Sequence, residues 1–422
     1  MDELSKMNYN IEPENALLIQ SGGYLMFDHK KVLIELRTLV IFREIQEDPV
    51  MRSLENFCVA LQVREGAQEA YSVFLHHLYQ KGGDLGNHLL HLVMNSENFY
   101  VRQKGLHIDT EIKKCLDWEL EIFQSWSQWE PSSLIKEMKI AEVKELRFFP
   151  SFHNTSHSFA SRFYTRMQEI ETTGYGIFSQ YTMFQLWEHQ LRPIRNPDTQ
   201  SLSSLVGYEK ERSKLLANTQ SFLAGKSATN ALLYGDAGTG KSSTIKALVN
   251  EYHPQGLRLI EIKKRQLDAI PELMDTLSEN PLKFIIFIDD LTFSRYDENF
   301  GSLKSLLEGG ASAQNRNVLI YATSNRRHLV RETMEERQGT EIHESDTIQD
   351  TIGLASRFGL TVTFQRPNRK AYLEIVAHYA KEYDLFMDPE EMKNSAEAYA
   401  LRSGGRSPRA AKQFVQLEKG LS

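Results

Sequence analysis

GDAGTGKS, residues 235–242, is the stretch of sequence that decides the fold of the C-terminal half of this chain. It fits the pattern G-x-x-x-x-G-K-[ST] of a phosphate-binding loop. The apolar run ALLY (231–234) before it predicts a buried strand, and STIKALVNEY (243–252) after it predicts a helix. A strand, a glycine-rich loop and a helix in this order are the context that such a loop requires.

The residue types of this loop suit a polyphosphate. Its glycines let the backbone turn tightly with the N–H groups pointing inward, and these groups and the helix N-terminus stabilise negative charge. Lys241 can reach the β- and γ-phosphates of a nucleotide, and Ser242 can bind Mg²⁺. The loop residues expected to contact the nucleotide are Gly235, Asp236, Ala237, Gly238, Thr239, Gly240, Lys241, Ser242 and Ser243.

Two carboxylates follow a second apolar strand. FIIFIDDL (284–291) ends in Asp289 and Asp290, which places both at the carboxyl edge of a sheet, beside the phosphate loop. Asp289 is expected to hold Mg²⁺, through water, and Asp290 to orient or deprotonate an attacking water. Capping of the next helix is the alternative role for such aspartates.

A third strand, in VLIYATSNRR (318–327), ends in a neutral amide. Asn325 could donate a hydrogen bond to the γ-phosphate or to the attacking water, and ordinary turn chemistry is the alternative. Two arginines follow in LASRFGLTVTF (354–364) and GGRSPRAAKQF (404–414). Arg357 precedes a strand and Arg409 begins the last helix; a lone arginine is normally a solvated surface residue, so only the order of all five elements favours a function for them.

The pattern of apolar residues divides the chain. Residues 1–191 are predicted to be a mostly helical domain, with helices at 31–45, 110–126 and 178–191, and the polar, proline-containing stretch 192–204 a linker. Short apolar runs then alternate with helical stretches, which predicts an α/β domain over 205–366 with a parallel sheet covered on both faces. Residues 367–422 are predicted to form a small helical lid.

These five elements, in this order, resemble the AAA+ ATPase family over residues 200–422. The resemblance implies a P-loop fold with ATP and Mg²⁺ as ligands, and Val206 and Gly207 fall where the family contacts adenine. It makes Lys241 and Ser242 the Walker A pair and Asp289 and Asp290 the Walker B pair. It also makes Asn325 sensor 1, Arg409 sensor 2, and Arg357 an arginine finger that completes a neighbour's site in a homo-oligomer. The stretch around Arg357 is similar to the corresponding box of bacterial replication initiators, and the whole chain resembles a bacterial AAA+ family with a helical N-terminal domain.

One residue departs from the family pattern. Most of the superfamily has glutamate where this chain has Asp290, whose side chain is one methylene shorter and reaches less far toward an attacking water. Slow hydrolysis, or help from Glu308, would follow, although an ordinary position on a helix surface suits Glu308 better. Residues 331–350 hold seven acidic and two basic side chains, and either a moving element or a disordered insertion fits them.

Composition bounds the remaining possibilities. The chain has 422 residues, of which 41% are hydrophobic and 25% charged, so we expect a soluble protein of two or three domains. No span is apolar enough for a membrane helix, the N-terminus is polar and acidic, and two cysteines cannot form a disulfide framework, so the cytoplasm is expected. The histidine pairs at 88 and 91 and at 153 and 157 have no acidic or cysteine partner at a fixed spacing, so they do not favour a metal site.

Charge gives nucleic-acid binding no support. The formal net charge is −7; residues 1–200 hold 27 acidic and 20 basic side chains, and residues 201–422 hold 29 of each. A local basic patch on such a protein remains possible. Three hypotheses follow: an ATPase that remodels or assembles a protein partner, a nucleotide-gated switch or scaffold with little turnover, and a DNA-associated ATPase.

Overall fold

The computed structural model describes residues 25–103, 108–138, 149–292, 298–307, 316–325 and 357–421. The chain divides into two compact units, residues 1–167 and 168–422. The domain limits expected from the sequence, at 191 and 204, stay a prediction. No helix among the described residues is long and apolar enough to cross a membrane.

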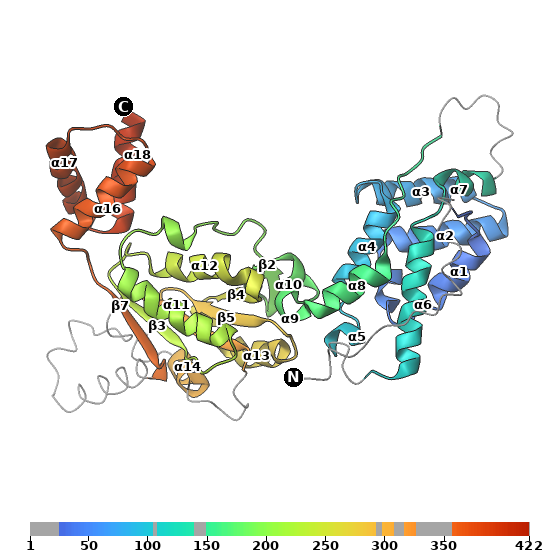
Figure 1. Ribbon diagram of the computed structural model, residues 1–422, viewed down its shortest axis with the longest axis horizontal. Coiled ribbons are helices and arrows are strands. Elements are labelled where there is room, and N and C mark those ends of the chain that lie inside the picture. The colour runs from blue at the N-terminus through green and yellow to red at the C-terminus, as the bar shows by residue number, and fades with distance from the viewer. Residues whose placement is uncertain are drawn as a thin grey trace. The chain divides into compact units, whose positions relative to one another are not determined.

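The N-terminal unit is built from helices (Figure 1). They are α1 (His29–Arg37), the 3₁₀ helix η3 (Arg43–Glu47), α2 (Pro49–Val63), α3 (Ala67–Tyr79), α4 (Leu85–Asn95), α5 (Phe99–Arg102), α6 (Thr110–Trp126), α7 (Pro131–Glu137) and α8 (Phe159–Gln168). The helix expected at 110–126 is thus confirmed, whereas 31–45 breaks into α1 and η3. Residues 153–157 are not helical, so His153 and His157 do not share a helix face.

A fully buried carboxylate fixes the break between α1 and η3. The side chain of Glu119 accepts hydrogen bonds from the backbone N–H groups of Val40 (2.6 Å), Ile41 (2.9 Å) and Phe42 (2.9 Å). A buried charge normally carries a large desolvation cost, and several hydrogen bonds from N–H groups offset it. The loop is therefore held by one side chain of α6.

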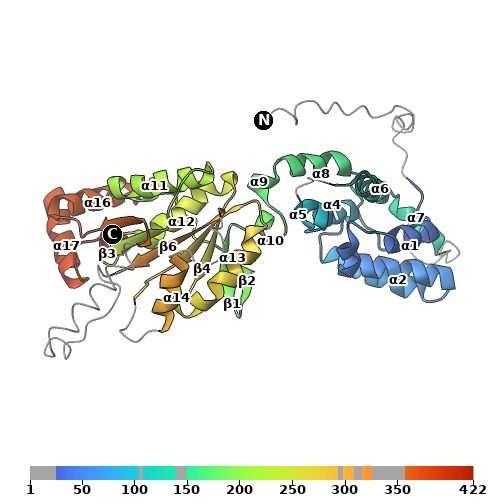
Figure 2. The ribbon, with the colours of Figure 1, turned by 90° about the horizontal axis from the view of Figure 1, so that it is seen from below.

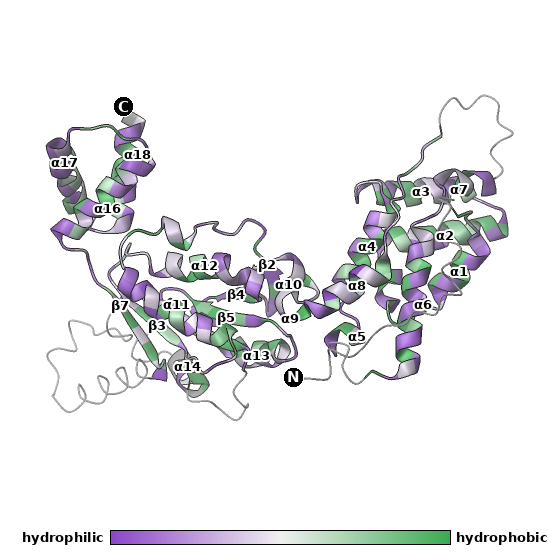
Figure 3. Cartoon of the chain, in the orientation of Figure 1, coloured by the Kyte–Doolittle hydropathy of each residue, from purple (hydrophilic) through white to green (hydrophobic). Residues whose placement is uncertain are grey.

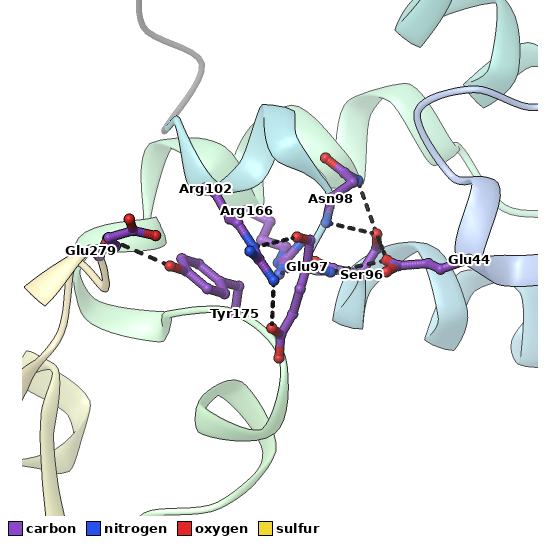
Figure 4. A network of polar contacts seen from close by, with 8 residues as sticks. All are labelled: Glu44, Ser96, Glu97, Asn98, Arg102, Arg166, Tyr175 and Glu279. Atoms are coloured by element: carbon purple, nitrogen blue, oxygen red, sulfur yellow. Dashed lines mark hydrogen bonds and ion pairs between the residues drawn. The ribbon is translucent and has the colours of Figure 1, made fainter. Parts of the chain in front are cut away.

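A second polar cluster joins the ends of several short elements (Figure 4). The hydroxyl of Ser96, just after α4, donates to a carboxylate oxygen of Glu44 in η3. The same hydroxyl accepts from the side-chain amide of Asn98, the N-cap of α5, at 2.9 Å. The carbonyl oxygen of Ser96 accepts from Arg166 of α8 at 3.5 Å. These bonds connect the turn between α4 and α5 to η3 and α8.

The second unit contains a seven-stranded sheet in the order β2-β1-β4-β5-β6-β3-β7. Its strands are β1 (Met183–Trp187), β2 (Gln190–Pro193), β3 (Ala231–Gly235), β4 (Leu257–Ile262), β5 (Lys283–Ile288), β6 (Val318–Ser324) and β7 (Leu360–Phe364). Every pair is parallel except β1 with β2. The parallel sheet expected from the five apolar runs is thus confirmed.

Helices cover both faces of this sheet (Figure 2). One core packs α11 (Glu209–Leu223) and α12 (Lys241–Tyr252) on side chains such as Leu259 and Ile285. The other packs α13 (Ile270–Ser278) and α14 (Glu298–Leu307) on side chains such as Ile260 and Ile286. Because both faces are buried, the central strand β5 is apolar from Phe284 to Ile288 (Figure 3). Smaller elements are α9 (Ile170–Thr173), α10 (Ile177–Gln180), η5 (Leu202–Ser204), η6 (His253–Gln255) and η7 (Lys264–Ala269).

The helix expected at 178–191 is wrong. The short helix α10 ends at Gln180, and the chain then forms the hairpin of β1 and β2. Apolar residues at positions 184, 187 and 191 have the three- and four-residue spacing of a helix, but Phe184 and Leu186 point into one core while Gln185 and Trp187 are exposed. The segment forms a strand rather than a helix because β1 pairs with β4, a contact with a distant part of the chain.

The C-terminal residues form the expected helical lid. Its helices are α16 (Arg369–Glu382), α17 (Pro389–Arg402) and α18 (Pro408–Leu421), and they share a core of their own. The side chains of Asn368 and Asp388 accept hydrogen bonds from first-turn N–H groups and so cap α16 and α17.

Candidate functional site

The phosphate-binding loop begins where β3 ends. Gly235 has φ +141°, and a Cβ atom there would lie 2.0 Å from the carbonyl oxygen of Phe364 in β7. A side chain is therefore excluded at this position by both backbone conformation and space. Gly240 has φ +93° and is the N-cap of α12, so Lys241 is the first residue of the helix. The expected strand, loop and helix are all present.

Lys241 turns back into the loop. Its ammonium group donates to the carbonyl oxygens of Gly235 (2.9 Å) and Asp236 (2.8 Å) and to Oδ1 of Asn325 (2.9 Å). The residue is only 6% exposed. Burial lowers the pKa of Lys241; the nearby aspartates oppose this shift, while the positive charge of Arg409 adds to it.

A hydroxyl and a carboxylate meet beside the loop. Ser242 donates to Oδ1 of Asp289 at 2.6 Å, and Thr323 of β6 donates to the same oxygen at 2.5 Å. The three residues come from α12, the end of β5 and β6, which are neighbours at the carboxyl edge of the sheet. Hydroxyl and carboxylate oxygens are ligands that suit Mg²⁺, so the donor set fits this ion.

Asp290 has an unusual backbone. Its φ is +52°, in the left-handed region that few residues other than glycine adopt. Its N–H group donates to the hydroxyl of Thr323 (3.0 Å), and its carboxylate accepts from Nδ2 of Asn325 (2.8 Å). Asn325 therefore contacts both Lys241 and Asp290 with one amide. The structure brings these predicted residues together at one point.

The lid touches the phosphate loop. The N–H group of Arg409 in α18 donates to the carbonyl oxygen of Gly238 at 3.2 Å, which places the start of this helix on the loop. Asp236 accepts from the backbone N–H (3.1 Å) and from Nε (3.0 Å) of Arg366, where the chain passes from β7 to the lid. Arg366 was not predicted, because its position gives no signal beyond its place after a strand.

The residues expected near adenine lie between the sheet and the lid. Val206 packs against the core of the lid. A Cβ atom on Gly207 would lie 3.4 Å from Ile375 of α16. Tyr208, which the sequence did not single out, donates its hydroxyl to the carbonyl oxygen of Gln365 at 2.6 Å, and its ring lies 5.2 Å from that of Phe364. This segment therefore borders the hinge of the lid.

Arg357 lies toward the other edge of the sheet. In the parallel pair β3–β7, Leu360 is opposite Ala231 and Phe364 is opposite Gly235. Arg357 lies three residues before β7 begins, whereas the phosphate loop follows Gly235 at the other end of the paired strands, and the strand between these ends is about 13 Å long. This is the one predicted catalytic residue that the structure does not bring to the others.

Two features that the sequence analysis singled out cannot be placed, and the described residues hold no cluster of metal-binding side chains. Glu308 and residues 331–350 lie outside the described residues. Within the described part of the chain, no three histidine, cysteine, aspartate or glutamate side chains gather as they would to hold a metal ion. The pair Ser242 and Asp289 is a different kind of donor set, because one of its members is a hydroxyl group.

Sequence comparison identifies the family. The profile of a family described as "Protein of unknown function (DUF815)" matches residues 179–421. The chain belongs to the DUF815 family. Together with the motif order, this match and the relatives below make the chain a member of the AAA+ superfamily with its general ATP-binding function.

Two curated proteins are similar to part of this DUF815 chain. The replication factor C large subunit of Methanococcus vannielii is 23% identical over 137 residues, which are 32% of this chain and 27% of that protein. The probable mitochondrial chaperone BCS1-A of Dictyostelium discoideum is 26% identical over 156 residues, which are 31% of this chain and 36% of that protein. The chain thus spans about a third of the length of these relatives.

Solved structures of RuvB from Thermotoga maritima are also similar. A structure of a RuvB point variant has a TM-score of 0.35 and 18% identity, and the match covers 52% of this chain and 64% of that one. The structure described as the RuvB Holliday junction branch migration motor has a TM-score of 0.34 and 19% identity, and the match covers 51% of this chain and 63% of that one.

Proposed function

We propose that this protein binds and hydrolyses ATP with Mg²⁺ and uses the cycle to remodel or assemble a protein partner. The observation that carries the proposal is the meeting of Lys241, Asn325 and Asp290 at the mouth of a glycine-rich loop, 2.8–2.9 Å apart in a single chain of hydrogen bonds. A cation, an amide and a carboxylate within hydrogen-bonding distance of one another are the groups that phosphoryl transfer needs.

The loop is assigned to the triphosphate. Backbone N–H groups of residues 235–243 and the N-terminus of α12 bind the phosphates, and Lys241 exchanges its carbonyl partners for phosphate oxygens. Ser242 and Asp289 hold Mg²⁺, which neutralises charge on the phosphates when bound. Arg409 adds positive charge from the lid, and Val206 and Gly207 lie beside the adenine.

Hydrolysis is assigned to the strand ends. Asp290 orients or deprotonates the attacking water, and Asn325 positions the γ-phosphate or this water. Arg357 lies too far along the sheet to serve its own loop. We therefore assign it to the site of a neighbouring copy in a homo-oligomer, where it stabilises charge in the transition state. The N-terminal unit is assigned to an unknown protein partner.

A second candidate function is a nucleotide-gated switch or scaffold with little turnover. The short side chain of Asp290 and its hydrogen bond to Asn325 favour it, because both hold the carboxylate back from an attacking water. A DNA-associated ATPase is a third possibility, which the overall charge of the chain does not support.

Steady-state phosphate release separates these candidates. The wild type is measured at saturating ATP with Mg²⁺ and with excess chelator, and the Lys241→Ala variant, purified in the same way, gives the contaminating background. An ATPase releases phosphate in many turnovers, only with Mg²⁺ and only with Lys241 intact. Release of less than one phosphate per chain, with ATP retained, supports the switch and contradicts the ATPase.

A further inference from the structure

The hairpin of β1 and β2 extends the sheet beyond β4 and carries a polar face of its own. Gln185 of β1 is opposite Arg192 of β2 and Glu261 of β4, and Trp187 is opposite Gln190. Because side chains alternate along a strand, these residues lie on one face of the sheet. We call the set Gln185, Trp187, Gln190, Arg192 and Glu261, together with Lys263 and Arg265 just after β4, the edge face.

The edge face continues the side of the sheet that α12 covers, but it lies beyond that helix. Met183 of β1 is buried in the core with α12, whereas Gln185 and Trp187, two and four residues further along, are exposed. Trp187 is 44% exposed. A single exposed apolar side chain is common on protein surfaces, so the surroundings of Trp187, a flat ring that can stack on a planar ligand, decide whether it binds one.

The tryptophan borders a hollow. The guanidinium carbon of Arg192 lies 5.4 Å from the centre of its ring. A cavity of about 150 Å³ at the carboxyl ends of β1 and β4 is lined by Trp187, Lys263 and Arg265 among others. The carboxyl ends of strands are where open α/β sheets bind their ligands. The hollow is separate from the phosphate loop, which follows β3.

Local charge at this hollow is positive although the whole chain has a net charge of −7. Neither Lys263 nor Arg265 forms an ion pair with any residue that the structure describes. Of the carboxylates that line the hollow, Glu261 is paired with Lys246 of α12 at 3.3 Å, which leaves Glu188. Lys263 and Arg265 therefore line the hollow with Glu188 as its one carboxylate outside an ion pair among the described residues, and Arg192 lies next to it against the ring of Trp187, so the local charge favours an anion.

The turn of the hairpin is held in an unfavourable conformation. Glu188 and His189 have φ of +47° and +61°, a two-residue turn that normally selects asparagine and glycine. Each such residue costs about 1 kcal/mol or more. The turn sets Trp187 directly opposite Gln190 and so fixes the aromatic ring beside the cations.

We propose that the edge face binds single-stranded nucleic acid, with a base stacked on Trp187 and phosphates at Arg192, Lys263 and Arg265. The face offers a flat ring, cations on three neighbouring segments and the amides of Gln185 and Gln190, rather than an apolar groove. A planar and polyanionic ligand matches this set better than an acidic peptide does. The proposal does not depend on ATP binding.

Fluorescence anisotropy of end-labelled oligo(dT) and oligo(U), about 20 nucleotides long, tests the proposal on the full chain without ATP. The two probes distinguish DNA from RNA. We expect binding at low salt, with log K falling against log salt at a slope of about −2, as three phosphate contacts require. The Trp187→Ala variant should bind at least about tenfold more weakly, and Trp187→Phe should retain most of the affinity, because stacking needs any flat ring.

The Lys263→Ala/Arg265→Ala double variant should bind more weakly and reduce the salt slope by about 1.4. Lys370→Ala removes an exposed lysine of the lid and should bind like the wild type. Circular dichroism confirms that each variant is folded. The proposal is overturned if the folded wild type binds neither oligomer at low salt, or if the edge-face variants bind like the Lys370 control. A polyglutamate peptide that displaces the probe better than unlabelled oligonucleotide would also overturn it and point to a protein partner.

Discussion

Asn325 accepts a hydrogen bond of 2.9 Å from the ammonium group of Lys241. The other end of its side-chain amide donates to Asp290 at 2.8 Å, so one residue connects the phosphate loop to the second strand-end carboxylate. If a phosphate draws Lys241 away, the amide of Asn325 loses a partner and can turn. We therefore expect ATP to loosen the hold of Asn325 on Asp290.

Asp290 is predicted to limit hydrolysis without contributing much to ATP binding. Replacing it by asparagine keeps its size but removes the base, so phosphate release should fall at least about 10²-fold, while ATP affinity stays near that of the wild type. The Asp290→Glu variant restores the usual length, and a faster rate in it would show that the short side chain is a brake. Wild-type turnover in the asparagine variant would contradict the assigned role.

Asp289 is predicted to act through Mg²⁺. In the Asp289→Asn variant, ATP affinity measured with Mg²⁺ should fall at least about tenfold, because a charged ligand of the ion is lost, whereas affinity measured with chelator should change little. The exposed Asp268 provides a matched control, since Asp268→Asn removes the same charge away from the loop. Equal losses with and without the ion would mean that Asp289 supports the fold rather than the metal.

Arg357 is predicted to act on a neighbouring copy. The Arg357→Ala variant should bind ATP like the wild type and lose about 10³-fold or more in turnover. Mixing it with Lys241→Ala, which keeps Arg357 but lacks a working loop, should restore part of the activity, because each variant supplies what the other lacks. Light scattering with a slowly hydrolysed ATP analogue reports the assembly that this requires. No recovery in a mixed oligomer would contradict action on a neighbouring copy, and wild-type turnover in Arg357→Ala alone would place the residue outside the mechanism.

The two cysteines are predicted to be unreactive in the folded protein. Burial raises the pKa of Cys58 to about 12 and that of Cys115 to about 11, from an ordinary value of 9.0. Near pH 8 the folded chain therefore holds almost no thiolate, whereas the unfolded chain holds an appreciable fraction. Above pH 9 the unfolded state ionises first, so stability falls as pH rises toward these higher values. Alkylation should be slow until denaturant is added, and rapid modification of the native protein would contradict the burial of these thiols.

Much of the C-terminal half could be predicted from sequence because its signals are local. GDAGTGKS carries its own turn chemistry, and FIIFI and VLIYA are apolar throughout because the sheet is covered on both faces. The strand-end residues Asp289 and Asn325 follow from the geometry of a parallel sheet. The hydrogen bond of Asn325 to Asp290, the residue after Asp289, needed only that β5 and β6 be neighbours in the sheet.

Features that depend on tertiary contacts could not be predicted. The strand β1 was mistaken for a helix because its pairing with β4 is not visible in its own residues. The pairing of Arg366 with Asp236 joins positions 130 residues apart. The hydroxyl of Thr323 donates to Asp289 only because β5 ends beside it. Neither the left-handed backbone of Asp290 nor that of Glu188 has a sequence signal, since neither residue is glycine.

Calorimetric titration with Mg²⁺ and a slowly hydrolysed ATP analogue tests the central claim most directly. The account predicts that one analogue binds per chain and that Lys241→Ala binds at least about tenfold more weakly, because charge-assisted hydrogen bonds to the phosphates are lost. Lys246→Ala, in the same helix but paired with Glu261, should bind like the wild type. A wild-type protein that shows no heat of binding, or a Lys241→Ala variant that binds as tightly as the Lys246 control, would contradict a nucleotide site in this loop.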